Sequence, residues 1–347
     1  MKAGIAGAGI MGRLLARALR RAGWDITLYD QHDGCANCSS VAAGLLSPIS
    51  ELDKATMLIY RMGMESITTH WPEIVRECPD PIFFKKMGSL VVHHPQDQIE
   101  WDHFSRRVTQ QLGPDHTSFE MLSNEQLIQL EPTLGKFERA YFLPDEAQID
   151  SQSLMTHLNQ NIVINTRVIS IHPGEIHTEN QTHHFDHVFD CRGLGARDSF
   201  DDLRGVRGEL IWLDAPDVHI TRPIRLLHPR YSLYIVPRPG NIYIVGASES
   251  ETDDDSPISV RTTLELLTAC YYVHSGFAEA SIIKTVTHHR PTLSDHLPRI
   301  RTTDGLTAIN GLYRHGYLIA PTIAEEIVRD QRRYPEIWED YDDHHAK

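Results

Sequence analysis

The hydrophobic pattern at the amino end predicts a β-strand, a helix and a second strand in close succession. Ala3 to Ala6 is a short apolar run typical of a buried strand. After a glycine-rich turn, Gly23 is placed to end a helix with a left-handed residue. Asp25 to Asp30 is apolar and β-branched enough for a second strand that finishes on an acid. The helix between the strands has its apolar face at Met11, Leu14, Leu15, Ala18 and Ala22.

The rest of the chain alternates between helical and β-type patterns. Residues 51–77 carry apolar side chains along one helical stripe, and Pro72 is expected to kink or break that helix near its end. Pro237 to Gly240 predicts the turn of a hairpin. A last helix at 317–329 tolerates Pro321 only if that proline lies in the first turn. Strands are also predicted at 88–93, 162–164, 168–171, 187–193, 208–212, 231–236, 241–246 and 306–310, and helices at 124–131, from 151, and at 260–272.

Length and charge narrow the class of protein. The chain has 347 residues, 41% of them hydrophobic, which is enough for a core in two compact units or one two-lobed unit. No apolar run approaches the roughly 20 residues that a membrane span needs. The formal charge of -14 lacks the basic surplus of a nucleic-acid-binding surface, so no such partner is expected. The odd number of cysteines, five, favours a reducing, cytoplasmic location.

Gly7, Gly9 and Gly12 form a GxGxxG motif between the first strand and the helix. Gly7 permits the tight turn, Gly9 lets the backbone approach a pyrophosphate, and Gly12 allows the helix to pack closely on the strand. Asp30, 18 residues after Gly12, is placed to accept hydrogen bonds from an adenosine ribose. The motif predicts a Rossmann-type dinucleotide site and does not choose between NAD and FAD.

Two other polar motifs are not interpreted as functional sites. Cys35 and Cys38 form a CxxC pair, which suits a redox pair or half of a zinc site. No second CxxC and no histidine stands at ligand spacing, so no metal is predicted. The acids Asp253 to Asp255 are interpreted as a solvated loop.

A second signal follows the βαβ unit. Cys38 to Pro48 is a run of small residues, which let a backbone pass close to a flat ring system and its phosphates. With its SxAAG stretch, this run resembles the flavin-contacting loop of the glycine oxidase and D-amino-acid oxidase family of FAD enzymes. The resemblance spans essentially the whole chain, and is greatest to the glycine oxidase type at Gly311 to Gly316. Other matching segments are Phe189 to Gly193, Leu233 to Arg238, His289 to Pro291, Leu297 to Ile300 and Asn310 to Pro321.

This resemblance assigns site residues. Arg290 matches the arginine that binds the substrate carboxylate, a role that suits an always charged, planar guanidinium. Arg314 and Tyr234 match further substrate-pocket positions. From the residues alone, Arg290 could instead be a structural salt-bridge arginine, Arg314 could place the helix after it, and Tyr234 could be a plain sheet tyrosine. FAD contacts are implied for Gly7, Gly9, Ile10, Met11, Gly12, Asp30, Gln31, Cys38, Ser39, Ala43, Gly44, Leu45, Val168, Gly193, Leu312, Tyr313, Arg314, His315, Gly316, Tyr317 and Leu318.

The resemblance implies an FAD-dependent oxidase that deaminates glycine or a small D-amino acid, with a role in thiamine biosynthesis. Arg290 would fix the carboxylate, and the α-hydrogen would pass as hydride to flavin N5 without a side-chain base. The positive end of the helix near Tyr317 would stabilise the anionic reduced ring. Oxygen would reoxidise the flavin to give hydrogen peroxide, and the imine would hydrolyse to an oxo acid and ammonia. Two alternatives stay open: an FAD dehydrogenase or oxidase of a secondary amine such as sarcosine or proline, and a flavin-bound subunit or maturation factor without independent turnover.

Three residues depart from the pattern of the family. Cys191 and Arg192 stand where many flavoproteins have small residues before a glycine, and Leu45 replaces a methionine found in some glycine oxidases. No cysteine lies near Arg314, so noncovalent FAD is expected.

The expected fold is α/β with two lobes, a Rossmann-type FAD-binding domain and a mostly antiparallel β-sheet substrate domain. The FAD-binding domain is predicted to be discontinuous, from residues 1–80, 146–204 and 296–347, with the substrate domain from 81–145 and 205–295. The expected partners are a small amino acid or amine and O2. Formation of a homo-oligomer is left open.

Overall fold

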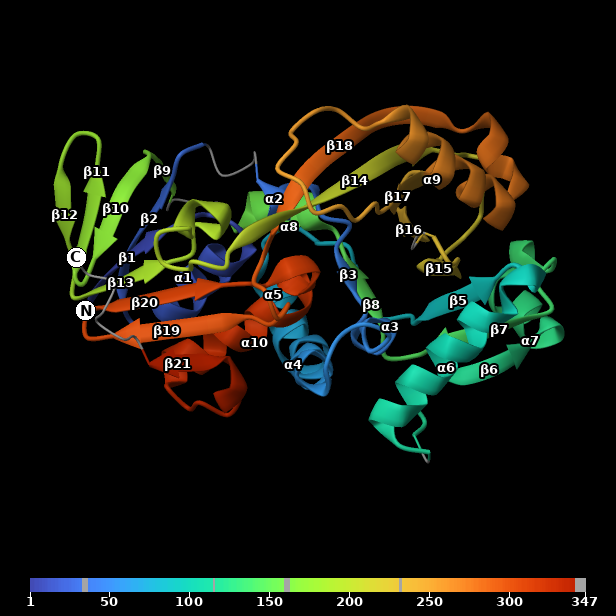
Figure 1. Cartoon of the computed structure of the whole chain (residues 1–347), viewed down its shortest axis with the longest axis horizontal. Coiled ribbons are helices and arrows are strands. Elements are labelled where there is room, and N and C mark those ends of the chain that lie inside the picture. Colours follow the sequence, from blue (N-terminus) through green and yellow to red (C-terminus); the bar gives the residue numbers. More distant parts are fainter. Residues whose placement is uncertain (33–36, 115, 159–162, 231–232, 341–347) are drawn as a thin grey trace.

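A computed structural model of the chain describes residues 1–32, 37–114, 116–158, 163–230 and 233–340. Figure 1 shows two lobes side by side, one built on a largely parallel sheet and the other on a largely antiparallel sheet. The two longest strands, β14 (Arg204–Asp214) and β18 (Ser281–Thr292), run from the first lobe into the second. The α/β fold expected from the sequence is confirmed, whereas the domain boundaries stay a prediction.

The first lobe contains a seven-stranded sheet. Its order is β21-β19-β20-β13-β1-β2-β9, and β9, β2, β1, β13 and β20 are parallel. Because parallel strands end at one edge of the sheet, the glycine turn after β1 lies beside the ends of β2 and β13. The strands are β1 (Lys2–Ala6), β2 (Asp25–Asp30), β9 (Val163–Asn165), β13 (His187–Asp190), β19 (Arg299–Thr303), β20 (Leu306–Asn310) and β21 (Trp338–Asp340).

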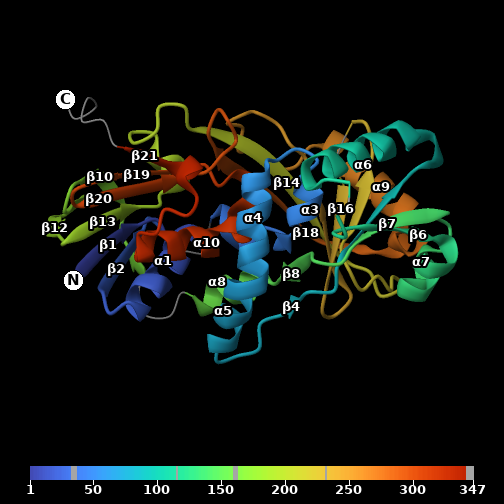
Figure 2. The same ribbon diagram turned by 90° about the horizontal axis from the view of Figure 1, so that it is seen from below.

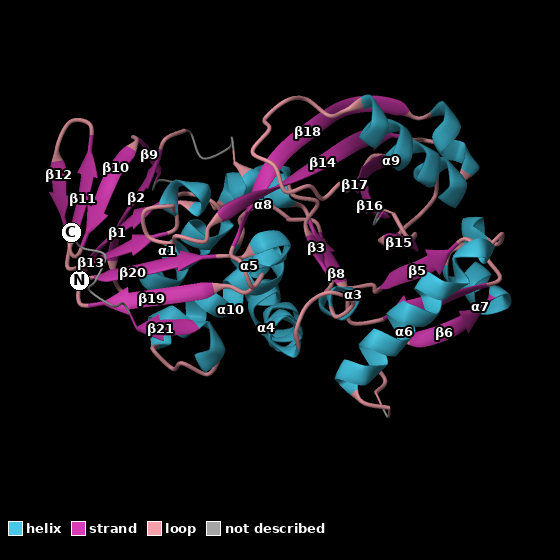
Figure 3. Cartoon of the chain, viewed as in Figure 1, coloured by secondary structure: helices cyan, strands magenta, loops and turns pink. Residues whose placement is uncertain are grey.

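Both faces of this sheet are covered. Helices α1 (Ile10–Arg21) and α10 (Gly316–Arg329) pack against one face and against each other. The other face carries a three-stranded sheet of β10 (Val168–His172), β11 (Glu175–Thr178) and β12 (Thr182–His184), seen at the outer end of the lobe in Figure 3. Apolar runs such as β1 suit this double burial, because strands covered on both faces need few polar side chains.

The second lobe contains an eight-stranded sheet in the order β18-β14-β17-β16-β15-β5-β7-β6. All neighbouring pairs are antiparallel except β15 with β5. The predicted hairpin is confirmed, but Pro237 and Arg238 belong to its strand, so the turn is Pro239 to Asn241. The other elements are β5 (Ser89–His93), β6 (Glu120–Ser123), β7 (Arg139–Leu143), β15 (Ile224–Leu227), β16 (Leu233–Arg238), β17 (Ile242–Gly246), α6 (Gln98–Leu112), α7 (Asn124–Leu130) and α9 (Val260–Val273).

Short elements lie where the lobes meet, and Figure 2 shows α4 (Met57–Glu65) standing between the two lobes. The helix expected over 51–77 begins only at Met57, because the short helix before it ends at Glu51. Pro72 does not break it, because a π-helical turn (Ser66–His70) leads directly into α5 (Trp71–Glu77). The remaining elements here are α2 (Cys38–Val41), α3 (Pro48–Glu51), α8 (Ser151–His157), β3 (Leu45–Leu46), β4 (Phe84–Lys85) and β8 (Ala147–Ile149).

Pro321 corrects a second expectation, because it lies inside α10 and beyond the first turn. A proline has no N–H, so the carbonyl of Tyr317, four residues earlier, loses its intrahelical donor. The indole Nε1 of Trp71 donates to that carbonyl at 3.1 Å. The proline is therefore tolerated because a side chain from α5 replaces the missing donor.

No helix in the part of the chain that the structure describes is long and apolar enough to cross a membrane.

Candidate active site

A cavity of about 670 Å³ lies between the two sheets. It brings together Arg290, Arg314 and Tyr234 with every predicted cofactor residue except Gly12. The predicted residues that line it include Gly7, Gly9, Ile10, Met11, Asp30, Gln31, Cys38, Ser39, Ala43, Gly44, Leu45, Val168, Gly193 and Leu312 to Leu318. Segments far apart in the sequence thus meet at one site.

The glycine turn has the geometry that its sequence predicts. Gly7 has a φ of +98°, and a Cβ atom there would lie 2.3 Å from the carbonyl oxygen of Cys191. A Cβ on Gly12 would lie 2.0 Å from the Gly7 carbonyl oxygen, which explains why Gly12 packs the helix on the turn and does not line the cavity. Any side chain at either position would force the backbone apart.

Two side chains from other segments hold this turn. The Ile10 N–H donates to the Ser39 hydroxyl at 2.9 Å, and the Ala8 N–H donates to the Asp30 carboxylate at 2.7 Å. Asp30 also accepts the His32 N–H at 3.1 Å. Because the first turn of α1 contains no acidic residue, its positive end is left available to a phosphate.

The loop of small residues is anchored by Arg238, which was not among the predicted site residues. The residue is 9% exposed, and its guanidinium donates to the carbonyl oxygens of Ala43 and Ile149 and to the side chain of Gln148. Burial lowers the pKa of this guanidinium to about 10. Gly44 is required beside it, since a Cβ there would lie 1.9 Å from the Ile149 oxygen.

The start of α10 forms another wall of the cavity. Leu312 to Leu318 line it, and no side chain caps this helix. The Tyr317 hydroxyl donates to the carbonyl of Ser39 at 2.8 Å, and its ring stacks on Trp71. The helix therefore presents uncapped N–H groups and a positive end toward the cavity.

Arg290 is held by backbone carbonyls. Its Nη1 lies 3.4 Å from the carbonyl oxygens of both Arg207 and Ser248. Among the residues described, no carboxylate lies within ion-pair distance of it. Gly208 makes room for the guanidinium, since a Cβ there would lie 2.2 Å from Arg290 Nη2. The structural salt bridge considered for Arg290 is thus not formed in the described part of the chain.

Arg314 has a different environment, because carboxylates surround it. Its Nε lies 2.6 Å from the Glu51 carboxylate, and its Nη1 lies 3.6 Å from Glu249. Burial alone would raise the pKa of Glu51, but the charges of Arg314, His315 and Arg225 outweigh it and hold that pKa at about 2. Arg314 thus links the start of α10 to α3, as the positioning alternative expects, while still lining the cavity.

Tyr234 and Cys38 also line the cavity. The Tyr234 hydroxyl has no hydrogen-bond partner among the described residues, and burial raises its pKa. Burial also raises the pKa of the Cys38 thiol, and the nearby charge of Arg290 opposes that shift. Within the described ranges, no group of three histidine, cysteine or acidic side chains could hold a metal ion. Cys35 lies outside those ranges.

Arg192, which departs from the family pattern, is neutralised locally. Its guanidinium forms two hydrogen bonds to the buried Asp190, at 2.9 and 2.8 Å, and one to Asp198 at 2.7 Å. Cys191 is buried beside the glycine turn. The departure is accommodated because the acid that ends β13 binds the arginine.

Comparison with known proteins accounts for this arrangement. Residues 2–329 match the DAO family of FAD dependent oxidoreductases. A Rhizobium etli protein that carries the name thiamine biosynthesis oxidoreductase ThiO is 36% identical over 326 residues, which cover 93% of this chain and 94% of that relative. A glycine oxidase of Geobacillus kaustophilus is 22% identical over 91% of this chain and 89% of its own length.

Solved structures share the fold. A glycine oxidase from Geobacillus kaustophilus superposes with a TM-score of 0.82 at 19% identity, covering 96% of this chain and 95% of that one. The iminodiacetate oxidase IdaA of Chelativorans sp. BNC1 gives 0.81 at 21% identity, covering 97% and 99%. The cofactor expected from the sequence, FAD, is confirmed by the family match. The chain therefore belongs to the DAO family of FAD-dependent oxidoreductases.

Proposed function

We propose that this enzyme oxidises a small α-amino acid, glycine or a small D-amino acid, to the imine, with O2 as the final electron acceptor. The observation that carries the proposal is Arg290, a guanidinium at the cavity whose contacts among the described residues are carbonyl oxygens and not carboxylates. A charged guanidinium without an internal counter-ion is a ready partner for a substrate carboxylate. The names of the relatives, a thiamine biosynthesis oxidoreductase and a glycine oxidase, support the same substrate class and suggest a role in thiamine biosynthesis.

The residues present fit noncovalent FAD. The turn at Gly7 and the loop at Gly44 are positions that a Cβ atom would close, so backbone can approach a ligand there. The uncapped starts of α1 and α10 suit the negative charge of a pyrophosphate and of a reduced ring. When bound, FAD supplies the acceptor for the hydride that leaves the substrate α-carbon.

The chain's own residues then orient the substrate. Arg290 binds the carboxylate, and the Tyr234 hydroxyl, which has no partner among the described residues, donates a second hydrogen bond to it. Glu51 neutralises the charge of Arg314. Arg314 therefore shapes the cavity wall and positions α10, and it does not bind the substrate carboxylate. No side-chain base is needed when the α-hydrogen leaves as hydride.

We also propose that residues 81–145 and 205–295 form the substrate domain, because β14, β16 and β18 carry Gly208, Tyr234 and Arg290. A cytoplasmic location is supported by the free state of the four cysteines described, Cys38, Cys78, Cys191 and Cys270.

The test is anaerobic mixing of the FAD-loaded protein with glycine, sarcosine, proline and D-alanine, while flavin bleaching is followed. Bleaching by glycine or D-alanine, with peroxide formed once air is admitted, is the expected result. Bleaching by sarcosine or proline alone would favour the secondary-amine alternative, and bleaching by none would favour the subunit without turnover. In Arg290→Ala, the substrate concentration needed for half-maximal bleaching should rise about a hundredfold, as expected for loss of a charged hydrogen bond to a carboxylate. FAD should be retained.

A further inference from the structure

The paired strands β14 and β18 have two faces with different roles. Register places Val206 opposite Arg290 and Gly208 opposite His288, and Gly208, His288 and Arg290 line the cavity. Arg207 stands opposite His289, and with Glu209 it faces the other way, because side chains alternate along a strand. Arg207 and Glu209 do not line the cavity, so they form a second layer behind the carboxylate-binding arginine.

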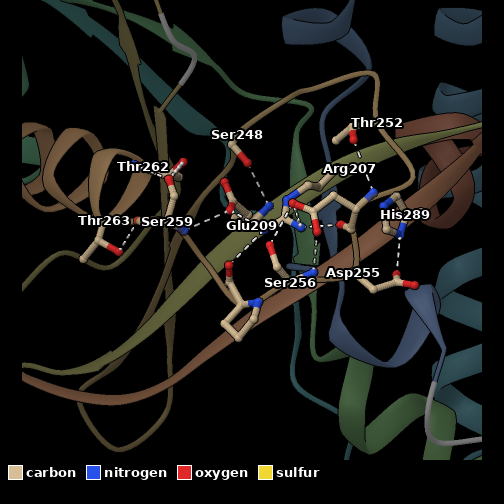
Figure 4. A network of polar contacts seen from close by, with 12 residues as sticks. Arg207, Glu209, Ser248, Thr252, Asp255, Ser256, Ser259, Thr262, Thr263 and His289 are labelled. Atoms are coloured by element: carbon tan, nitrogen blue, oxygen red, sulfur yellow. Dashed lines mark hydrogen bonds and ion pairs between the residues drawn. The ribbon is translucent and has the colours of Figure 1, made fainter.

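Arg207 is the centre of this outer layer, which Figure 4 shows with its contacts dashed. The residue is 5% exposed, and its guanidinium donates to the Glu209 carboxylate at 2.8 Å. The same guanidinium donates to the carbonyl oxygens of Asp254 and Pro257. Its own backbone exchanges two hydrogen bonds with Ser250, at 2.8 and 3.1 Å. One buried residue thus binds the segment between β17 and α9 at three points.

The acids of this segment add weaker contacts. Glu251 lies 3.3 Å from Arg204, Asp253 lies 3.1 Å from Arg197, and Asp255 lies 3.2 Å from His289. The loop expected at Asp253 to Asp255 is solvated, since side-chain exposure of Asp253 is 71% and of Asp255 is 92%. Exposed pairs of this kind contribute little. The buried contacts of Arg207 are therefore the main anchor.

The anchored segment begins with Ser248, and Ser248 reaches Arg290. The Ser248 hydroxyl accepts the Glu209 N–H at 3.0 Å, and its carbonyl oxygen lies 3.4 Å from Nη1 and 3.5 Å from Nη2 of Arg290. The second carbonyl that Arg290 meets is that of Arg207 itself. Arg207 thus supplies one of the two oxygens that meet the substrate-binding guanidinium. It also anchors, at Ser250, Asp254 and Pro257, the segment that supplies the other.

We propose that Arg207 is a positioning residue for Arg290. It acts through the backbone of Ser248 to Pro257 and through its own carbonyl, and it sets the direction in which the guanidinium of Arg290 faces the cavity. This inference rests on the proposed function of Arg290 as the carboxylate ligand.

The chain offers a matched control in Arg222. This arginine is 7% exposed, pairs with the buried Glu131 at 2.8 Å, and donates to the carbonyl oxygens of Met87 and Leu130. It has the same chemistry as Arg207 and no contact with Arg290 in the described structure. A merely structural arginine should behave like Arg222.

The experiment is a double-mutant cycle on the FAD-loaded enzyme. Arg207→Met, Arg290→Ala, the double variant and Arg222→Met are compared by the apparent Kd of glycine, or of D-alanine if glycine does not react, in anaerobic flavin reduction. Arg207→Met should raise that Kd about tenfold in the native background and by less than about twofold in the Arg290→Ala background, since coupled residues are not additive. The limiting reduction rate should change little. Arg222→Met should leave the Kd unchanged, and Arg207→Lys should restore part of the affinity.

The proposal is overturned if Arg207→Met leaves the Kd unchanged, or raises it equally in both backgrounds. If Arg290→Ala itself leaves the Kd unchanged, the proposed function of Arg290 fails. In that case a crystal structure of Arg207→Met decides the positioning role, which requires the Arg290 guanidinium to have left the Ser248 carbonyl. Should Arg207→Met fail to fold, Arg207→Lys and Glu209→Gln are taken through the same cycle.

Discussion

Gly208 and Arg290 compete for one small volume beside the cavity, since a Cβ atom on Gly208 would lie 2.2 Å from Arg290 Nη2. The two residues stand on neighbouring antiparallel strands, where Gly208 pairs with His288, two residues before Arg290. Because Gly208 has no side chain, the guanidinium of Arg290 can occupy this space.

Gly208→Ala should displace the guanidinium and not unfold the protein, because the clash involves the far end of a flexible side chain. We expect the apparent Kd of the amino-acid substrate to rise about tenfold and the free energy of unfolding to change by less than about 1 kcal/mol. Flavin-reduction titration and urea unfolding measure the two effects. Gly205→Ala, in the same strand, is the control, since its Cβ would meet Asp253 and His289 at 3.2 Å and not Arg290. Equal affinity loss in both variants would contradict this explanation.

Arg238→Met should loosen the loop of small residues. The carbonyl oxygens of Ala43 and Ile149 would lose their donor, and each buried unpaired carbonyl costs about 1–3 kcal/mol. We expect weaker FAD binding, measured as recovery of flavin fluorescence on dilution. Arg139→Met, which removes an arginine that lies over Trp101 in the other lobe, should retain FAD. Unchanged FAD affinity in Arg238→Met would mean that the loop is held by other contacts.

His315 should make the protein less stable in mild acid. Burial lowers the pKa of His315 to about 4, against about 6.5 for an unperturbed histidine. As pH falls from 6.5 toward 4, the His315 imidazole therefore binds a proton in the unfolded chain but stays neutral in the folded chain. The free energy of unfolding then falls by up to about 1.4 kcal/mol per pH unit from this residue alone.

The variant His315→Gln removes this titration and should make the pH slope of stability between 6 and 4.5 correspondingly shallower. Urea unfolding at fixed FAD concentration, repeated across that pH range, measures the slope. His184→Gln, at a histidine whose side chain is 73% exposed, should leave the slope as it is. A slope unaltered in His315→Gln would mean that the imidazole takes up its proton in the folded state.

Trp71→Phe should test the replacement donor in α10. The variant keeps an aromatic ring against Tyr317 but leaves the Tyr317 carbonyl without the indole N–H, at a cost of about 1–3 kcal/mol in unfolding free energy. In a Pro321→Ala background the alanine N–H can bind that carbonyl, so Trp71→Phe should then cost less. Trp338→Phe is a suitable control, because the Trp338 indole nitrogen has no hydrogen-bond partner among the described residues. Equal costs with and without Pro321 would remove the proposed link.

The sequence predicted what local pattern determines. Gly7, Gly12 and Asp30 follow one another within a single βαβ unit, so spacing alone gives the turn, the close packing and the acid at the strand end. Part of the order of helices and strands was predictable for the same reason, but α6 and the strand β18, which carries Arg290, were not predicted. The family resemblance added residues such as Arg290 and Tyr317, which no local pattern connects to the glycine turn.

Contacts between segments far apart in the sequence could not be predicted from local patterns. Arg238 binds the carbonyl of Ala43, and Arg314 binds Glu51, but the sequence near these residues does not predict either partner. Pro321 was placed wrongly because its tolerance depends on Trp71, a residue from another helix. Side chains that satisfy a distant backbone carbonyl leave no periodic signal, and only the folded chain reveals them.

The packing of α1 on α10 has a consequence for how the protein is made. Ile10 and Gly316 belong to opposite parts of the chain, yet a Cβ on Gly316 would lie 3.5 Å from the Ile10 side chain. On the ribosome, α1 is synthesised early and must wait for α10 before its apolar face is covered. The wall of the cofactor cavity that Leu312 to Leu318 form is therefore missing until this part of the chain has emerged, so the complete cavity is a late product of synthesis.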